Sequence, residues 1–307
     1  MDFKTCVEKR NSILMEGALG ERLKREYHLN FDEHVAMAKL IYNTNGRFAL
    51  KSLWQEYINI AVKYKLPFMA TTPTRRANQE RVEQAGCDSS IIFDNVKFLR
   101  RIQQESSLEM YVGGLMGCRG DAYTGENALS ENEAYAFHKW QADLFRAAEV
   151  DFLYAGIMPT LPEATGMAQA MSDTGLPYII SFTIQKDGKL IDGTTISKAI
   201  AAIDDSVHEK PVCYMTNCVH PSIVYEALSQ PFNQNALVKN RFLGIQANTS
   251  PLSYAELDES LDLKCSDPTQ FAEAMLKLRD ISNIKIFGGC CGTDNRHMEQ
   301  VANRLLA

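Results

Sequence analysis

Eight short apolar runs, separated by longer amphipathic or polar stretches, constrain the fold of this 307-residue chain more than any other feature. Short runs that are apolar throughout are typical of strands buried on both faces of a parallel sheet. The predicted strands are Ser12–Met15, Leu66–Thr71, Leu108–Gly113, Val150–Tyr154, Tyr178–Phe182, Val212–Thr216, Arg241–Ile245 and Ile284–Phe287. Eight strands, each followed by a helix, predict an α/β fold of the (β/α)8 TIM-barrel type, with a doubly wound open sheet as the alternative. Because no Pro/Gly/Ser-rich linker interrupts the pattern, we expect a single domain over residues 1–307.

Three of the predicted helices carry recognisable start signals. The clearest spans Glu131–Glu149, with Ser130 as its N-cap and acidic residues in its first turn. A second spans Pro268–Asp280, where Asp267 precedes a proline at the first helical position. The last, Asp294–Leu306, begins directly after a pair of cysteines.

Composition excludes several classes of function. A formal charge of −6 argues against nucleic acid or an acidic membrane surface as a partner. No apolar run approaches the ~20 residues of a membrane-spanning helix, and the N-terminus lacks the features of a signal peptide. Eight irregularly spaced cysteines do not resemble a secreted disulfide framework. We therefore expect a cytoplasmic protein with reduced thiols that acts on small molecules.

The segment Gly288-Gly289-Cys290-Cys291-Gly292-Thr293 is the strongest functional signal. Adjacent cysteines can bind one soft metal ion if the chain bends sharply, and glycines allow such bends. Cys218 offers a third thiolate, and three thiolates with one open position would form a catalytic zinc site. Three alternatives remain: a pair of core thiols, a phosphate-binding turn, and a structural zinc whose fourth ligand is Cys118 or His220. We interpret the remaining cysteines as small buried hydrophobes; these are Cys6, Cys87, Cys213 and Cys265.

The barrel prediction places the candidate residues on one rim. Active-site residues of such barrels lie just past the C-terminal ends of the strands. Those positions hold Glu16 and Gly17 after the first strand, Thr72 and Thr74 after the second, Gly114 after the third, Asn217 and Cys218 after the sixth, and Cys290 and Cys291 after the eighth. All three candidate metal ligands therefore share a rim.

These residues resemble the homocysteine S-methyltransferase family over nearly the whole chain. The resemblance rests on the Gly-Gly-Cys-Cys-Gly-Thr motif, on Asn217-Cys218 followed by Pro221, on Glu16-Gly17-Ala18-Leu19-Gly20, on Thr71-Thr72-Pro73-Thr74, on Ser181-Phe182 with Asp192-Gly193, and on Asn248. It implies a (β/α)8 barrel with Zn²⁺ held by Cys218, Cys290 and Cys291. It also implies substrate-binding roles for Glu16, Gly17, Thr72, Thr74, Asn217 and Asn248. The implied activity is methyl transfer from a cationic donor to the zinc-bound thiolate of homocysteine, giving methionine, or of a related thiol.

The chain also departs from the family pattern. Glu16 stands where the family usually has Asp, and Gln246-Ala247-Asn248 replaces its usual Tyr-Pro-Asn. Gly156 and Ile157 replace a Glu-Thr pair whose carboxylate, in the family, helps to bind the homocysteine ammonium group. Losing a hydrogen bond to that charged group costs ~1.5–3 kcal/mol, so we expect weaker homocysteine binding unless Glu163 or another carboxylate compensates.

Three functions are compatible with this pattern. The first is a zinc-dependent thiol S-methyltransferase, acting on homocysteine or a different thiol. The second is a non-catalytic zinc- or thiol-binding relative with a regulatory or partner-subunit role. A zinc hydrolase is disfavoured, because catalytic hydrolase zinc usually has histidine or carboxylate ligands and a general base. A homo-oligomer is compatible with all three.

Overall fold

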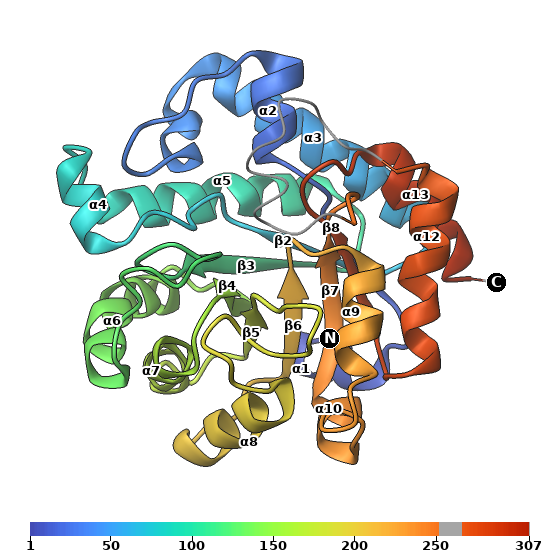
Figure 1. The fold of residues 1–307 in the computed structure, drawn as a ribbon. Coiled ribbons are helices and arrows are strands. Elements are labelled where there is room, and N and C mark those ends of the chain that lie inside the picture. The colour runs from blue at the N-terminus through green and yellow to red at the C-terminus, as the bar shows by residue number, and fades with distance from the viewer. Residues whose placement is uncertain (252–265, 307) are drawn as a thin grey trace.

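A closed barrel of eight parallel strands forms the centre of the molecule (Figure 1). The computed structural model describes residues 1–251 and 266–306. The strands follow one another around the barrel in chain order, and β1 pairs with both β2 and β8. They are β1 (Ile13–Met15), β2 (Phe68–Thr71), β3 (Met110–Gly117), β4 (Phe152–Met158), β5 (Tyr178–Phe182), β6 (Cys213–Asn217), β7 (Phe242–Ala247) and β8 (Ile286–Gly289). The predicted (β/α)8 fold is confirmed, and the open-sheet alternative is wrong.

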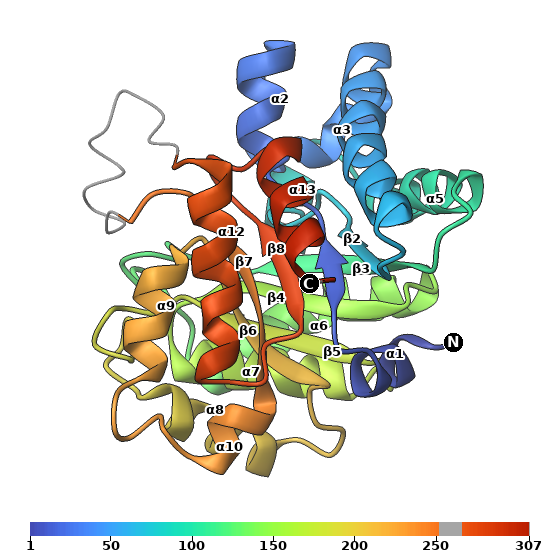
Figure 2. The ribbon, with the colours of Figure 1, turned by 90° about the vertical axis from the view of Figure 1, so that its right-hand side faces the viewer.

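Helices surround the barrel and connect its strands (Figures 1 and 2). In chain order they are α1 (Phe3–Lys9), α2 (Gly20–Tyr27), η1 (Met37–Tyr42), α3 (Thr44–Lys63), α4 (Gln79–Gln84), α5 (Ser90–Glu105), α6 (Glu131–Ala147), α7 (Leu161–Ser172), α8 (Ile196–Ser206), α9 (Pro221–Leu228), α10 (Ala236–Arg241), α12 (Pro268–Lys277), η2 (Leu278–Asp280) and α13 (Asn295–Arg304). None of the helices in residues 1–251 and 266–306 is long and apolar enough to cross a membrane.

The predicted helix starts are confirmed. Ser130 and Glu133 form a capping box at the start of α6, as the sequence pattern indicates. Asp267 accepts hydrogen bonds from the first turn of α12, and Asp294 does the same for α13. Cys265, interpreted from the sequence as a structural thiol, lies outside the described residues.

One end of the barrel is closed, which leaves the other for chemistry. The inward side chains form a buried apolar cluster that includes Met15, Met69 and Phe152. The short helix α1 joins this cluster at the N-terminal ends of the strands, where Phe3 stacks on Phe152 with ring centroids 4.2 Å apart. Because α1 covers that end, the C-terminal rim is the open face.

Strands β3 and β4 continue beyond their predicted ends at Gly113 and Tyr154, reaching Gly117 and Met158. The sequence suggests a stop at the glycine pair, but both glycines lie inside β3. A Cβ atom at Gly113 would lie 2.4 Å from the Phe152 ring, and one at Gly114 would lie 2.6 Å from the Phe145 ring. These glycines therefore make room for aromatic neighbours and do not end the strand. Gly114 accordingly lies within β3 and not past its end.

Candidate metal centre

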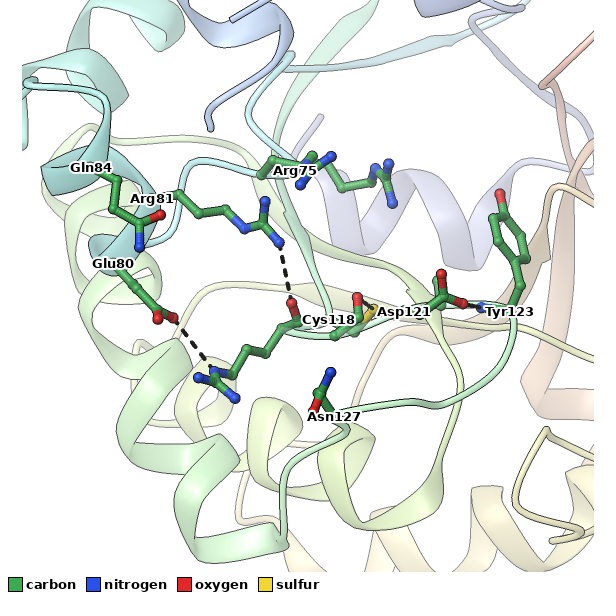
Figure 3. Close-up of a pocket in the computed structure, with 12 residues that line it drawn as sticks. Arg75, Glu80, Arg81, Gln84, Cys118, Asp121, Tyr123 and Asn127 are labelled. Atoms are coloured by element: carbon green, nitrogen blue, oxygen red, sulfur yellow. Dashed lines mark hydrogen bonds and ion pairs between the residues drawn. The ribbon is translucent and has the colours of Figure 1, made fainter. Parts of the chain in front are cut away.

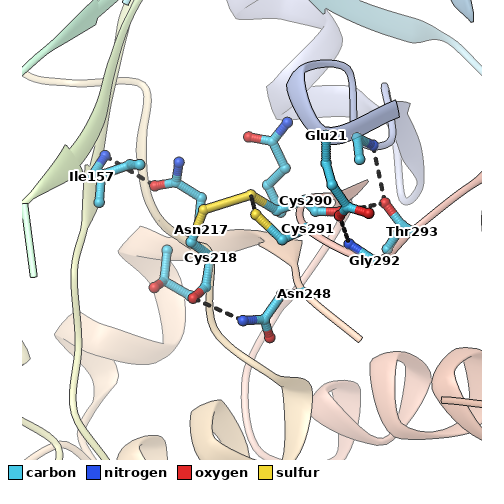
Figure 4. The surroundings of a disulfide bond; sticks show 12 residues. Glu21, Ile157, Asn217, Cys218, Asn248, Cys290, Cys291, Gly292 and Thr293 are labelled. Carbon is cyan, nitrogen blue, oxygen red and sulfur yellow. Dashed lines mark hydrogen bonds between the residues drawn. A yellow bond between two sulfur atoms is a disulfide. The ribbon is translucent and has the colours of Figure 1, made fainter. Parts of the chain in front are cut away.

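Three thiols from two strands meet on the open rim (Figure 4). Cys218 directly follows β6, and Cys290 and Cys291 directly follow β8. Their Sγ atoms all lie within 4.8 Å of one another. Cys290 and Cys291 Sγ are 3.9 Å apart, and Cys218 is joined to Cys290 as a disulfide. The structure therefore brings together the three cysteines predicted as ligands. Two of them form a disulfide, which must be reduced before they can bind a metal ion.

The turn that carries Cys290 and Cys291 is fixed by its neighbours. A Cβ atom at Gly289 would lie 2.3 Å from Thr293 Oγ1, so only glycine fits there. The Thr293 hydroxyl donates to the Cys290 carbonyl at 2.7 Å and accepts from the Ala18 amide at 3.0 Å. Gly292 adopts a φ of +81°, which glycine reaches without steric cost. The motif thus encodes a rigid bend that presents both sulfurs.

Cys218 lies across from Cys290 and Cys291, and its backbone has an unusual conformation. Its φ is +59°, a value uncommon outside glycine and associated with functional sites. Asn248 supports it, since Asn248 Nδ2 donates to the Cys218 carbonyl at 3.2 Å. Asn248 Oδ1 is buried and has no hydrogen-bond partner among the described residues. If Asn248 binds substrate, as predicted, a donor group of the substrate could form a hydrogen bond with this Oδ1 atom.

The donor set fits zinc. Cys291 is exposed at its surface, but desolvation by the surrounding protein, together with the negative charge of Glu21, raises the pKa of its thiol. A bound cation would therefore be needed to hold it as a thiolate. Zinc–sulfur bonds of about 2.3 Å in a tetrahedron separate the sulfurs by about 3.8 Å, close to the 3.9 Å between Cys290 and Cys291. Once Cys218 is reduced, these three cysteines would supply three ligands and leave one position for substrate.

The other candidate ligands lie outside the sulfur cluster. Among the described residues, the grouping contains only Cys218, Cys290 and Cys291. Cys118 packs nearby, but burial raises its pKa to about 12 and its thiol faces the Gly120 carbonyl. His220 caps α9, where its Nδ1 accepts from the Ser222 amide. Both arrangements favour an open three-sulfur site over a closed structural zinc.

Glu16 directly follows β1, is buried, and is not a solvated rim charge. Its carboxylate accepts hydrogen bonds from Trp54 Nε1 at 2.7 Å, from Thr71 Oγ1 at 2.6 Å and from the Thr71 amide at 3.0 Å. Burial raises its pKa to about 7 in spite of these donors. The protein itself thus orients the carboxylate; its contact with substrate stays a prediction.

The raised pKa of Glu16 predicts a measurable pH dependence of stability. Because the folded protein prefers the protonated acid, this residue's favourable contribution is greatest below its unfolded pKa of about 4.5 and is lost as pH rises through about 7. Glu16→Gln removes this titration. Denaturant unfolding should show the variant gaining about 2–3 kcal/mol relative to wild type between about pH 5 and pH 8. A difference that is constant with pH would contradict the burial argument.

The remaining predicted rim residues mostly serve the scaffold. Gly17 faces Tyr57, and a Cβ atom would lie 2.6 Å from its hydroxyl oxygen and 2.7 Å from its ring. Thr72 and Thr74 Oγ1 atoms lie 2.7 Å apart, and both bond the backbone of Leu115. These contacts tie the loop after β2 to β3. Substrate binding by Gly17, Thr72 and Thr74 is not tested by this geometry and remains a prediction.

Gly156 and Ile157 lie beside the thiols, where the family's ammonium-binding carboxylate is missing. A Cβ atom at Gly156 would point between Leu115 and Asn217. Ile157 has a φ of +59°, an outlier for a β-branched residue, and its amide donates to Asn217 Oδ1 at 3.0 Å. Its side chain packs with Cys218 and Ala122. The wall next to Cys218 is therefore apolar.

Glu163 does not replace the missing carboxylate. It is fully buried and bonds the Arg119 amide at 2.7 Å, the Leu129 amide at 3.4 Å and His138 Nε2 at 3.2 Å. Its oxygens hold the loop between β3 and α6 in place. Glu163 therefore does not supply the carboxylate for the homocysteine ammonium group that the sequence analysis considered.

Sequence reasoning missed a group of arginines at the same rim. Arg75 and Arg76 follow Thr74, and Arg119 follows Cys118 just past β3. The rule that places functional residues after strand ends applies to them as it does to the cysteines. Their position directly after strand ends is the signal in the sequence that could have identified them.

The fold and site define a parallel barrel with a three-thiol centre at its C-terminal rim. The homocysteine S-methyltransferase family model matches residues 13–305, and the chain belongs to this family. A homocysteine S-methyltransferase, YbgG of Bacillus subtilis (strain 168), is 22% identical over 188 residues, an alignment that covers 60% of this chain and only 56% of that relative. The metallated form of the homocysteine methyltransferase MmuM from Escherichia coli superposes with a TM-score of 0.77 at 18% identity, covering 98% of both chains. Its oxidized form gives a TM-score of 0.76 at 18% identity over 97% of both chains.

Proposed function

We propose that this chain is a zinc-dependent thiol S-methyltransferase. The observation that carries the proposal is the meeting of Cys218, Cys290 and Cys291 Sγ within 4.8 Å on the open rim. Family membership supports it, as does the likeness of the fold to MmuM. The acceptor is homocysteine or a related thiol, and the methyl donor is cationic.

Each part of the site has a separate task. When bound, zinc would deprotonate the substrate thiol, while three anionic thiolate ligands keep its sulfur nucleophilic. Asn248 fixes the Cys218 backbone, and Thr293 fixes that of Cys290. The apolar wall of Ile157 and Ala122 excludes water beside the reacting sulfur. Holding sulfur and methyl group in line supplies much of the remaining rate.

The methyl-transfer step needs no general base, because the attacking sulfur is already deprotonated. The substrate sulfur forms a bond to the methyl carbon as the bond between that carbon and the donor's cationic atom breaks. The electron pair of the broken bond leaves with the donor, which becomes neutral. The thiol proton has already passed to solvent.

Two forms of MmuM, metallated and oxidized, share this chain's fold. We infer that this chain also has two forms, one with zinc and one with the Cys218–Cys290 disulfide. Activity therefore requires prior reduction.

The test is methyl transfer by reduced, zinc-loaded protein. S-methylmethionine, S-adenosylmethionine and betaine are each paired with homocysteine and a panel of other thiols, and methylated product is measured by mass spectrometry. We expect zinc-dependent turnover with at least one pair. Stoichiometric zinc without turnover on any pair would instead support a non-catalytic thiol-binding protein.

A further inference from the structure

A cationic cavity opens over the loop that follows β3 (Figure 3). It measures about 640 Å³ and lies between the loop after β2, helix α4 and the loop after β3. Its lining includes four arginines and two carboxylates; these are Arg75, Arg76, Arg81, Arg119, Glu80 and Asp121. This local excess of positive charge contrasts with the net charge of −6 on the chain.

The carboxylates in the cavity are already engaged. Glu80 faces Arg119 at 3.5 Å, and Asp121 Oδ1 accepts hydrogen bonds from the Tyr123 and Thr124 amides. Arg75 and Arg76 form no salt bridge with any residue in 1–251 or 266–306. Guanidinium groups that line one cavity without a salt bridge favour a bound anion.

Mutual repulsion among the arginines supports this assignment. Burial and the positive charges of Arg76 and Arg75 lower the pKa of Arg81. Arg81 Nη2 is directed at the Arg119 carbonyl, 3.5 Å away, and not at a carboxylate. The four arginines of the cavity outnumber its two carboxylates, so the lining keeps a net positive charge.

The cavity adjoins the site of the proposed chemistry and shares two residues with it. Cys118 and Ala122 line it, and the same two residues pack with Ile157, Cys218 and Cys290. A molecule with its sulfur at Cys218 would thus pass an apolar stretch and then reach the arginines. Near that sulfur, Gly156 provides no carboxylate for an ammonium group.

We propose that the acceptor thiol carries an anionic group, a carboxylate or sulfonate, that Arg75 and Arg76 bind, and that it needs no amino group. This inference rests on the proposed function and narrows its substrate class. The apolar stretch holds the carbon chain between sulfur and anion. Arginine suits this role, because its planar guanidinium binds such oxygens in pairs.

Matched thiols test the proposal by isothermal titration calorimetry on reduced, zinc-loaded protein. The series is homocysteine, its deamino analogue 4-mercaptobutanoate, 3-mercaptopropane-1-sulfonate and the neutral 4-mercapto-1-butanol. We expect the anionic thiols to bind at least about tenfold more tightly than the alcohol, and 4-mercaptobutanoate to bind at least as tightly as homocysteine. Comparing carboxylate with sulfonate identifies the preferred anion.

Substitutions of the cavity arginines test whether these residues cause the preference for anionic thiols. Arg75→Gln and Arg76→Gln should each remove most of the anion preference while leaving binding of the neutral alcohol unchanged. The control is Arg101→Gln, which removes an exposed charge near the end of α5, at the opposite end of the barrel. Equal affinity for anionic and neutral thiols, or a preference that survives both cavity substitutions, would overturn the inference.

Failure of the proposed function gives a different result. In that case the neutral thiol would not bind at all, whereas the thiol-free butanoate would still bind wild type more tightly than Arg75→Gln. Binding of the neutral thiol without any gain from the anion would leave the methyltransferase proposal in place and refute the anionic substrate. If butanoate bound both proteins equally and weakly, the cavity would have no anion site.

Discussion

Cys290→Ala should lose its zinc and its methyl transfer together. The substitution removes the sulfur that lies between the other two, 3.9 Å from Cys291 and bonded to Cys218. Losing even a residue that only hydrogen-bonds to a metal ligand typically costs 10–100-fold in metal affinity or activity, and losing a ligand itself should cost more. We expect the rate to fall by a factor on the order of 10³ or more, because deprotonation and orientation of the substrate sulfur are both lost.

The matched control is Cys87→Ala. Cys87 is half-buried, its sulfur donates to the Ala85 carbonyl, and it lies outside the sulfur cluster. This variant should keep one zinc per chain and wild-type turnover. Metal analysis and product formation are measured on both variants after circular dichroism has shown that they are folded. Retention of zinc by Cys290→Ala would remove the basis of the site assignment.

Gly156→Glu should restore recognition of an ammonium group. A side chain at this position points toward Asn217, and its Cβ atom meets only the flexible end of Leu115 as closely as 3.0 Å. A carboxylate placed there would gain a charged hydrogen bond of about 1.5–3 kcal/mol with homocysteine. That gain corresponds to roughly ten- to a hundredfold tighter binding.

Gly156→Gln is the control, because it adds the same bulk without the charge. Homocysteine affinity should rise only in the Glu variant, and the affinity for 4-mercaptobutanoate should fall there through charge repulsion. Calorimetric titration of both ligands separates these effects. Unchanged homocysteine affinity in Gly156→Glu would mean that the ammonium group is bound elsewhere.

Much of the fold could be predicted because its pattern is local. Each buried strand is a short apolar run, and caps such as Ser130 and Asp267 mark helix starts within a few residues. The ends of the strands are harder to predict from the sequence than their positions. Gly113 and Gly114 look like terminators, yet they continue β3 because Phe152 and Phe145 occupy the space where side chains would be.

The cysteines of the site could be found from sequence for the same reason. Barrel topology places strand ends on one rim, so Cys218 and Cys290 converge although 72 residues separate them. The environment of Glu16 could not be predicted, since its burial depends on Trp54 and Thr71 from other elements. The use of Glu163 in the loop after β3, the positive φ of Ile157 and the arginine cavity likewise depend on contacts between distant segments.

X-ray absorption at the zinc edge of the reduced protein tests the central claim most directly. The account predicts three sulfur ligands at about 2.3 Å and one lighter atom, changing to four sulfurs when an acceptor thiol is added. A first shell that contains nitrogen ligands, or one that does not change when thiol binds, would contradict it.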